Sequence, residues 1–155
     1  MRNDHTAFRL PRNSAYFVEH LQVLGREVRD GVMGGMHTST IEELAAATGE
    51  QGGDTIYRLD EHAEEVLLSY CSRWAEELPF LLVAEGLEGG ARVFPADAHP
   101  DHLAWSMVVD PIDGTRGLMY GKRSAWALFG IAPPPRAGWL PTLADVTVAL
   151  QAELP

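Results

Sequence analysis

Apolar residues recur every three or four positions near the start of the chain, which is the spacing of one face of an α-helix. Five such positions are separated by 4, 3, 4 and 4 residues: Phe17, Leu21, Leu24, Val28 and Val32. This pattern predicts a first helix over residues 13–35. Asn13 or Ser14 can serve as its N-cap, and Gly34-Gly35 as its end.

Two further helices are predicted before residue 79. Residues 40–49 form a short helix in this interpretation, because Ser39 with Glu42 or Thr40 with Glu43 fits a capping box and Gly49 can end it. A longer helix covers residues 60–78. Asp60 opens it and Pro79 ends it.

The pattern changes after Pro79 to short apolar runs bounded by Gly or Pro, which is typical of buried strands. Four runs are predicted as strands: Phe80–Ala84, Trp105–Val109, Ala125–Ile131 and Val146–Leu150. The Gly- and Pro-rich stretches 86–102 and 132–142 are predicted loops. Helices followed by strands indicate a layered α+β fold, with residues 1–155 as a single domain and the sheet over 79–152.

Charge and composition exclude several classes of function. The formal net charge is −10, and residues 40–88 account for all of it, with twelve acids against two Arg. An acidic chain is a poor partner for phosphate backbones, so nucleic-acid binding is not expected. Cys71 is the only cysteine, which excludes an internal disulfide and a multi-thiolate metal site. The apolar runs are too short to span a membrane and the first residues too polar for a signal peptide, so a cytoplasmic protein is expected.

Two of the predicted strands run directly into a carboxylate. Phe80–Ala84 is followed by Glu85, and Trp105–Val109 by Asp110. If these strands are neighbours that point the same way, both acids emerge at one rim of the sheet. Structural roles also fit these acids, because Asp110 can start a turn at Pro111 and Glu85 can be an exposed strand end.

The residues after Asp110 add further oxygen atoms. Asp113 follows three residues later and can cap a helix or return to the same rim, while the Ile112 carbonyl can supply another oxygen. Gly114 lets the backbone pass close to a ligand. Carboxylates with a carbonyl form the ligand set of a hard cation such as magnesium or manganese. Three neighbouring acids repel one another, which favours a bound cation.

The string Asp110-Pro111-Ile112-Asp113-Gly114-Thr115, preceded by the apolar run from Trp105, resembles the signature of the inositol monophosphatase family. That family comprises magnesium-dependent, lithium-sensitive phosphomonoesterases. Asp60 at the start of a helix and Glu85 after a strand resemble its two upstream acids. The separations 60 to 85 and 85 to 110 are both 25 residues.

The resemblance implies a role for each of these residues. Glu85, Asp110, Asp113 and the Ile112 carbonyl would bind two or more Mg²⁺ ions, with Mn²⁺ as a possible substitute. Glu85, Thr115 and Asp60 would be catalytic: Thr115 with Glu85 would position and deprotonate the attacking water, and Asp60 would hold an outer ion or its water. Asp113, Gly114 and Thr115 would hold the substrate phosphate. The implied reaction is hydrolysis of a small phosphorylated polyol or sugar by metal-activated water, in a homodimer.

The chain departs from the family pattern in several respects. Leu59 precedes Asp60 where the family usually has Thr or Ser. One acid, Glu85, is followed by Gly86 where the family has two acids, and Arg116 follows Thr115 where an Asn or a similar residue is usual. The family's second half supplies another metal-binding Asp, which has no match here. The chain is therefore expected to be incomplete at its C-terminus, in the manner of an N-terminal half.

Two alternatives come from other function classes. The first is a catalytically incomplete fragment, which binds metal or mediates assembly without turnover. The second is a helix-turn-helix DNA-binding module, formed by residues 40–62 with a helix, a Gly turn and a second helix. The second helix, read as residues 54–65, would carry one Arg and five acids, which phosphates repel.

Overall fold

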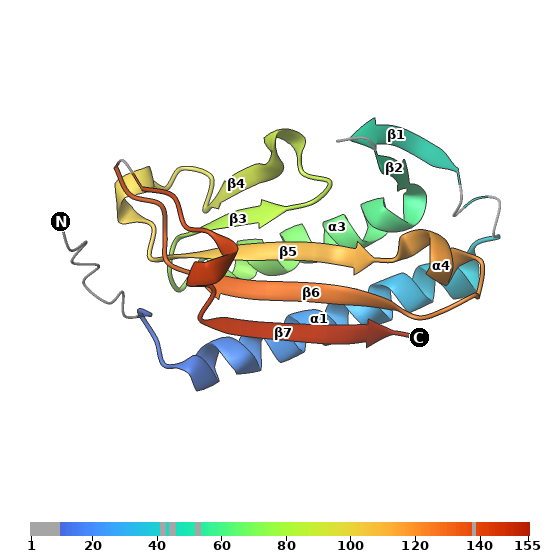
Figure 1. Cartoon of the computed structure of the whole chain (residues 1–155), viewed down its shortest axis with the longest axis horizontal. Helices are drawn as coiled ribbons and strands as arrows, with labels where there is room; N and C mark the ends of the chain where they lie inside the picture. Colours follow the sequence, from blue (N-terminus) through green and yellow to red (C-terminus); the bar gives the residue numbers. More distant parts are fainter. Residues whose placement is uncertain (1–9, 41–42, 44–45, 52–53, 138) are drawn as a thin grey trace.

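The structure is a computed structural model that describes residues 10–40, 43, 46–51, 54–137 and 139–155. It is built from long helices and one main sheet (Figure 1). The elements that position the site are α1 (Ser14–Thr38), β1 (Ala47–Gln51), β2 (Asp54–Tyr57), α3 (Arg58–Trp74), β3 (Phe80–Ala84), β4 (Ala91–Phe94), β5 (Trp105–Asp113), α4 (Thr115–Met119), β6 (Ala125–Ala132) and β7 (Val148–Leu154). Short 3₁₀ turns lie at Glu88–Gly90, Pro100–His102 and Leu143–Asp145.

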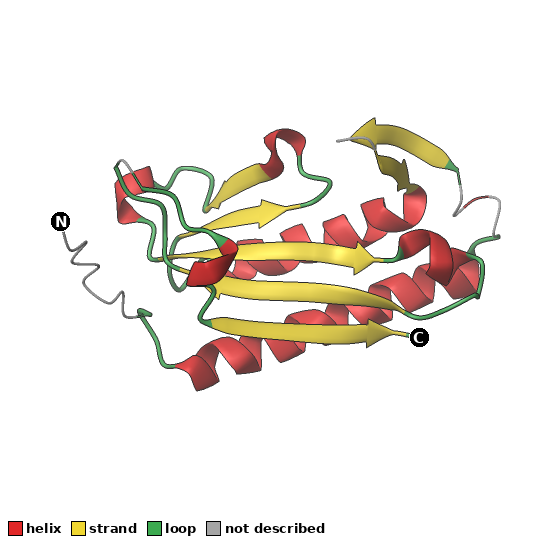
Figure 2. Ribbon diagram, viewed as in Figure 1, coloured by secondary structure: helices red, strands yellow, loops and turns green. Residues whose placement is uncertain are grey.

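The main sheet has the strand order β4-β3-β5-β6-β7. Only the β3–β5 pair is parallel, and the other neighbours are antiparallel. The long helices α1 and α3 pack against each other and against one face of this sheet, as Figure 2 shows. This confirms the predicted α+β class with helices first and a mainly antiparallel sheet afterwards.

The core lies between the helices and the sheet. Trp105 on β5 is 1% exposed. Its ring stacks on Phe80 at 4.2 Å and meets Trp74 of α3 at 4.6 Å and Phe17 of α1 at 5.3 Å between centroids. One side chain thus joins both helices to the two central strands. Cys71 is buried in the same core, as its place on the apolar face of the helix indicates.

The predicted helix boundaries need two corrections. α1 runs past Gly34-Gly35 to Thr38, because the Thr38 hydroxyl donates to the Gly34 carbonyl at 3.0 Å and supports one more turn. α3 covers residues 58–74 instead of 60–78, and the turns after Trp74 use shorter i to i+3 hydrogen bonds. Asp60 is therefore the third residue of α3, and Tyr57 is the N-cap.

The segment between the long helices was only partly predicted. The Thr40–Glu43 capping box is confirmed, since each backbone N–H donates to the other side chain at 2.8 and 3.2 Å. Residues 41–42 and 44–45 of the predicted short helix lie outside the described residues. From Ala47 onward the prediction is wrong, because β1 and β2 form an antiparallel hairpin. The helix-turn-helix alternative is wrong for the same reason, since Asp54–Tyr57 is a strand.

β3 and β6 match the predicted strands closely, whereas β5 continues past the predicted end at Val109 to Asp113. β7 begins at Val148 instead of Val146, and the short edge strand β4 occupies part of the predicted 86–102 loop. The residues of β4 show little alternation of polar and apolar side chains. Their extended backbone conformation depends on pairing with β3. Among the described residues, no helix combines the length and the apolar character needed to cross a lipid bilayer.

His20 on α1 predicts a pH dependence of stability. Its ring stacks on Trp74 at 4.5 Å, its Nδ1 lies 3.0 Å from the Tyr70 hydroxyl, and its Nε2 lies 3.7 Å from Glu77. Burial lowers the pKa of His20, against an opposing effect of the Glu77 charge. The folded chain thus binds its proton less readily than the unfolded chain. We expect stability to fall as the pH drops through about 6.5, the ordinary His value.

This pH effect can be measured by urea unfolding of the wild-type chain and His20→Gln at pH 5 and pH 8. The variant removes the titrating ring, so its stability should change less between the two pH values. His102→Gln, an exposed loop histidine, is the matched control. Equal pH slopes for the wild-type chain and His20→Gln would contradict the expectation.

Candidate active site

The parallel pairing of β3 and β5 sets Glu85 beside Asp110. The two strands pair in register from Phe80 with Trp105 to Ala84 with Val109, an offset of 25 residues. The Glu85 N–H continues the ladder by donating to the Val109 carbonyl at 3.3 Å. The prediction that both acids emerge at one rim is therefore confirmed.

Beyond Asp110, β5 makes an irregularity in its pairing with β6. Asp110 pairs with Leu128 and Asp113 with Trp126, so three steps along β5 correspond to two steps along β6. Pro111 has no N–H for the ladder, and the Ile112 N–H instead donates to the Asp110 carboxylate at 3.1 Å. A strand with a bulge thus replaces the turn predicted at Pro111. The bulge carries the chain to Asp113, which is exposed.

Gly114 and Thr115 connect this strand to α3. Gly114 is the N-cap of α4 with φ +100°, a conformation that favours glycine. The Thr115 hydroxyl that follows lies 2.8 Å from Asp60 Oδ1 and 3.0 Å from the Ile112 carbonyl. The other Asp60 oxygen, Oδ2, accepts the Tyr57 N–H at 2.8 Å. Asp60 therefore supports the start of α3 and contacts the site with the same carboxylate.

The acids at this rim influence one another. Burial raises the pKa of Asp110 to about 6, and the charges of Glu85, Asp113 and Asp60 add to the effect. Burial also raises the pKa of Asp60, which the Tyr57 N–H and the Thr115 hydroxyl partly offset by hydrogen bonding. Four carboxylates from three separate segments thus lie close enough to repel one another.

The donor atoms at the rim fit a hard divalent cation. They are carboxylate oxygens and a backbone carbonyl, and repulsion between them would be relieved by a positive ion. In the described part of the chain, no group of three or more His, Cys, Asp or Glu side chains is arranged to hold a metal ion. The match between these residues and a divalent cation therefore rests on the chemistry of the oxygen donors and on the repulsion between the carboxylates.

The structure brings the predicted residues together with one difference. Hydrogen bonds connect Asp60, Thr115, Ile112 and Asp110. Asp113 and Gly114 belong to the same chain segment, and Glu85 lies at the same rim. The resemblance paired Thr115 with Glu85, whereas the hydroxyl bonds to Asp60 and the Ile112 carbonyl. This contact joins residues that are 55 positions apart, so local spacing could not predict it.

Two residues near the site were missed as contributors. The Tyr57 hydroxyl accepts hydrogen bonds from Arg116 Nε at 3.2 Å and Nη2 at 3.1 Å. Glu64 on α3 places Oε2 3.6 Å from where a Cβ on Gly86 would lie. Its carboxylate therefore lies close to the position at which the chain lacks a second acid after Glu85. No sequence signal links either residue to the site, because both depend on how α3 docks.

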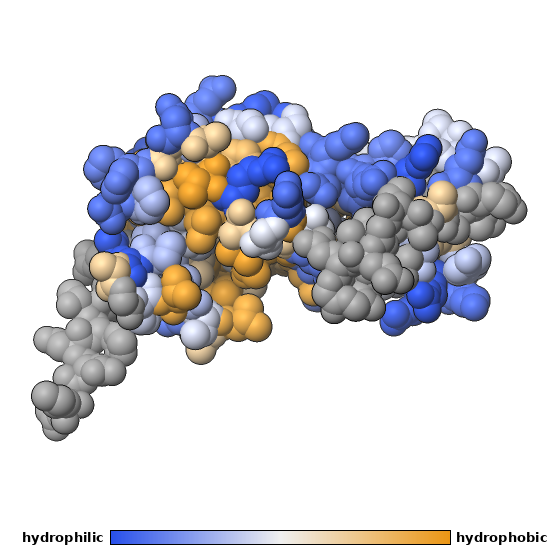
Figure 3. Space-filling model, turned by 90° about the horizontal axis from the view of Figure 1, so that it is seen from above, coloured by the Kyte–Doolittle hydropathy of each residue, from blue (hydrophilic) through white to orange (hydrophobic). Residues whose placement is uncertain are grey.

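A groove of about 640 Å³ opens beside the acids. Glu85 and Asp110 line one part of it. The remainder is mostly apolar and comes from β5, β6, β7, Leu143 and Val146. Leu140 and Leu143 are 74% and 78% exposed to solvent. Figure 3 shows apolar side chains open at the surface from above the molecule. The site therefore borders an apolar surface on one side.

Gly114→Ala should destabilise the chain by about 2 kcal/mol, because an L-residue at φ +100° is strained. Steric crowding is not the reason, because a Cβ at this position would lie 3.5 Å from its nearest neighbour, Arg123 Nη2, which is an ordinary van der Waals contact. Gly121→Ala is the matched control, at φ +60° with nothing within 4 Å, and should cost about 1 kcal/mol. Urea unfolding measures both. A smaller loss for Gly114→Ala than for Gly121→Ala would contradict this expectation.

The sequence matches no protein-family model, and no curated protein is similar enough in sequence to be recognised. Solved structures do resemble the chain. Leishmania major fructose-1,6-bisphosphatase in its holo form matches 93% of the chain with a TM-score of 0.57 and 17% identity. A putative sedoheptulose-1,7 bisphosphatase from Toxoplasma gondii matches 94% with a TM-score of 0.61 and 13% identity.

A third similar structure is the hypothetical protein PH1897 from Pyrococcus horikoshii, described as having similarities for inositol-1 monophosphatase. It matches 90% of the chain with a TM-score of 0.57 and 14% identity. The chain spans 45%, 44% and 44% of these three proteins, which is less than half of each. The chain therefore has the fold of the inositol monophosphatase and fructose-1,6-bisphosphatase structures.

Proposed function

We propose that this chain contributes the metal-binding and water-activating part of a magnesium-dependent phosphomonoesterase that acts on a small phosphorylated polyol or sugar. The observation that carries the proposal is the Thr115 hydroxyl, which lies within hydrogen-bond distance of both Asp60 and the Ile112 carbonyl. That contact joins the helix acid to the Asp110–Thr115 segment. The fold of bisphosphatases and of an inositol-monophosphatase-like protein supports the same reaction class.

In this proposal Glu85, Asp110, Asp113 and the Ile112 carbonyl hold two or more magnesium ions, with manganese as a substitute. Bound magnesium lowers the pKa of water and neutralises charge on the phosphate and on the leaving oxygen. The oxygen donors already lie at one rim of the sheet, and the bulge in β5 presents Asp113 to solvent.

Thr115 and Asp60 would activate the attacking water. The Thr115 hydroxyl can donate its proton to Asp60 Oδ1, and its oxygen can then accept a hydrogen bond from the water. The raised pKa of Asp60 makes that carboxylate a better proton acceptor than an exposed Asp. Glu85 would help to position and deprotonate that water. Asp113, Gly114 and Thr115 would position the substrate phosphate.

The alternative is a catalytically incomplete metal-binding or assembly module of the same fold. One observation favours it: an apolar groove borders Glu85 and Asp110, and another polypeptide surface can cover it. In this interpretation a further polypeptide surface is needed before substrate is turned over.

We also propose that the chain forms a homodimer. The exposed Leu140 and Leu143 supply apolar surface for such a contact. Multi-angle light scattering should give twice the mass of the chain. A monomer at all concentrations would contradict the dimer.

The experiment that tests the function is phosphate release from inositol 1-phosphate and a small panel of phosphomonoesters, with and without magnesium. A lithium titration and Asp113→Asn accompany it, and equilibrium magnesium binding is measured on the same samples. The proposed enzyme should show magnesium-dependent release that lithium inhibits and Asp113→Asn abolishes.

The other outcomes separate the two candidate functions. Magnesium binding that Asp113→Asn removes, without any phosphate release, would support the incomplete module. The absence of both binding and release would refute the proposed enzyme, the metal-binding module and the assignment of these carboxylates as metal ligands.

A further inference from the structure

Arg123 lies against α4 because the chain reverses direction directly after that helix. The Gly121 N–H donates to the Leu118 carbonyl at 2.9 Å. The Lys122 N–H donates to the Gly117 carbonyl at 3.0 Å. Gly121 has φ +60°, which favours glycine, and with these two bonds it forms a Schellman motif. Arg123 comes next, and its side chain returns along α4 toward the turn that links β5 to this helix.

Gly117 leaves open the space that the Arg123 side chain occupies. A Cβ on Gly117 would lie 2.7 Å from both Cγ and Nε of Arg123 and 3.2 Å from its Cδ, so a larger residue would displace that side chain. Glycine weakens a helix relative to alanine, and this contact gives a reason for its presence inside α4. At the far end of the side chain, Arg123 Nη2 lies 3.5 Å from the position of a Cβ on Gly114. Arg123 thus extends along α4 from Gly117 to the turn at Gly114.

The guanidinium of Arg123 keeps its hydrogen-bond donors available. Within the part of the chain that the structure describes, it forms no ion pair and no hydrogen bond. The neighbouring Lys122 differs, because its ammonium lies 5.7 Å from the Tyr120 ring centroid in a cation–π contact. Arg123 is therefore a solvent-exposed cation whose stem is positioned by packing and whose N–H groups can accept an anion as partner.

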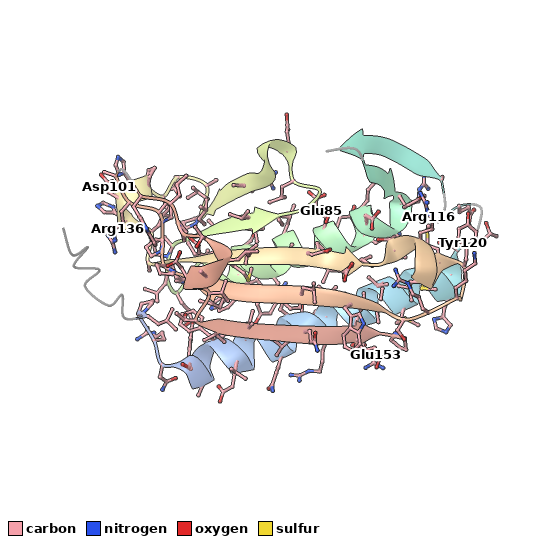
Figure 4. The ribbon with its side chains drawn as sticks, viewed as in Figure 1. Glu85, Asp101, Arg116, Tyr120, Arg136 and Glu153 are labelled. Atoms are coloured by element: carbon pink, nitrogen blue, oxygen red, sulfur yellow. The ribbon has the colours of Figure 1, made fainter. Side chains whose placement is uncertain are left out.

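This cation lies at the same end of the sheet as the candidate active site. Figure 4 shows Glu85 beside the end of β3 and Tyr120 beside α4, both toward this end. The proposal above positions the substrate phosphate at the Asp113–Thr115 segment, whose middle residue, Gly114, lies next to Arg123 Nη2. The acids at the rim repel a phosphate, and a positive group at this turn offsets that repulsion.

We propose that Arg123 is a phosphate-binding residue, which donates two N–H groups to the reacting phosphate at the Gly114 turn. This inference rests on the proposed function and adds a contact to its reaction site. A guanidinium suits this role because its planar pair of donors matches two phosphate oxygens. All phosphomonoesters share the group that is contacted, so the contact does not depend on the rest of the substrate. Gly117 is a positioning residue, because it acts through Arg123.

The test compares two substrates that share the phosphate and differ in the leaving group, inositol 1-phosphate and p-nitrophenyl phosphate. Steady-state kinetics with magnesium, and inhibition by inorganic phosphate, are measured for the wild-type chain, Arg123→Gln, Arg123→Lys and Gly117→Ala. Lys122→Gln is the matched control, since it removes the adjacent positive charge, whose ammonium lies over the Tyr120 ring.

Arg123→Gln should lower kcat/KM by roughly 10- to 100-fold on both substrates, which is the value of a hydrogen bond to a charged group. Inhibition by inorganic phosphate should weaken by a similar factor. Arg123→Lys should lose less, because it keeps the charge without the paired donors. Lys122→Gln should match the wild-type chain.

Gly117→Ala separates phosphate binding from stability. The new methyl group displaces the Arg123 stem, so inhibition by inorganic phosphate should weaken. Alanine is the better helix former, so the midpoint of urea unfolding should stay equal or rise. Wild-type phosphate affinity in this variant would overturn the positioning role of Gly117.

Three results would overturn the inference: unchanged kinetics in Arg123→Gln, a loss confined to one of the two substrates, or an equal loss in Lys122→Gln. If the wild-type chain releases no phosphate at all, the proposed enzyme fails, and titration calorimetry with inorganic phosphate and magnesium decides this inference separately. Phosphate binding that Arg123→Gln weakens at least roughly tenfold would then support it. Equal binding in the two chains, or no binding in either, would refute it.

Discussion

Asp110→Asn is expected to abolish magnesium-dependent phosphate release and to stabilise the metal-free chain at the same time. In the proposed site Asp110 is a metal ligand at the centre of the acids. A metal ion supplies several kcal/mol of transition-state stabilisation, so we expect at least a roughly 1,000-fold loss in kcat/KM. Magnesium binding should weaken in parallel when it is followed by titration calorimetry.

The gain in stability has a separate cause. Burial and the charges of Glu85, Asp113 and Asp60 raise the pKa of Asp110 to about 6, so the ionised carboxylate opposes folding above that pH. Asn removes the charge but keeps an oxygen for the Ile112 N–H. We expect unfolding at pH 7.5 without magnesium to require on the order of 1 kcal/mol more free energy.

The matched control is Asp97→Asn, which neutralises an exposed acid in the loop after β4. It should change neither activity nor stability measurably. Retained turnover in Asp110→Asn would remove Asp110 from the catalytic site. A variant that is less stable than the wild-type chain without magnesium would show that repulsion does not dominate at this rim.

Trp105→Ala is expected to have the largest effect on stability, with a loss of about 3–5 kcal/mol. Trp105 is buried to 1% exposure and contacts Phe17, Trp74 and Phe80. Removing it leaves a cavity where both helices meet the central strands. Because Trp105 pairs with Phe80 at the start of the parallel register, the alignment of Glu85 with Asp110 should loosen as well.

Urea denaturation measures this loss, with Trp126→Ala as the control of the same residue type. Trp126 is 36% exposed and should cost about 1 kcal/mol or less. If Trp105→Ala does not fold, Trp105→Phe keeps an aromatic ring and should still cost about 1–2 kcal/mol. A Trp105 variant no less stable than Trp126→Ala would contradict the assignment of Trp105 to the centre of the core.

Much of the fold was predictable because its signals are local. The helical spacing from Phe17 to Val32 reflects burial of one face of α1, and all five of those residues are buried. The strands β3, β5 and β6 are apolar runs with Gly or Pro nearby, and packing of the sheet against α1 and α3 favours that composition. The hairpin β1–β2 and the edge strand β4 lack such a signal, because pairing with a neighbour defines them.

The candidate site also combines features that the local sequence predicts with contacts that depend on the tertiary structure. The order and type of Asp60, Glu85 and the Asp110–Thr115 string were sufficient to predict the fold and to single out the candidate site residues, because the strand ends and the glycine at position 114 are visible in the local sequence. Only the tertiary structure decided which of them touch. The parallel register brought Glu85 to Asp110, and the docking of α3 brought Asp60 to Thr115 and Tyr57 to Arg116. These contacts join residues 25, 55 and 59 positions apart, and packing between layers, not local spacing, determines them.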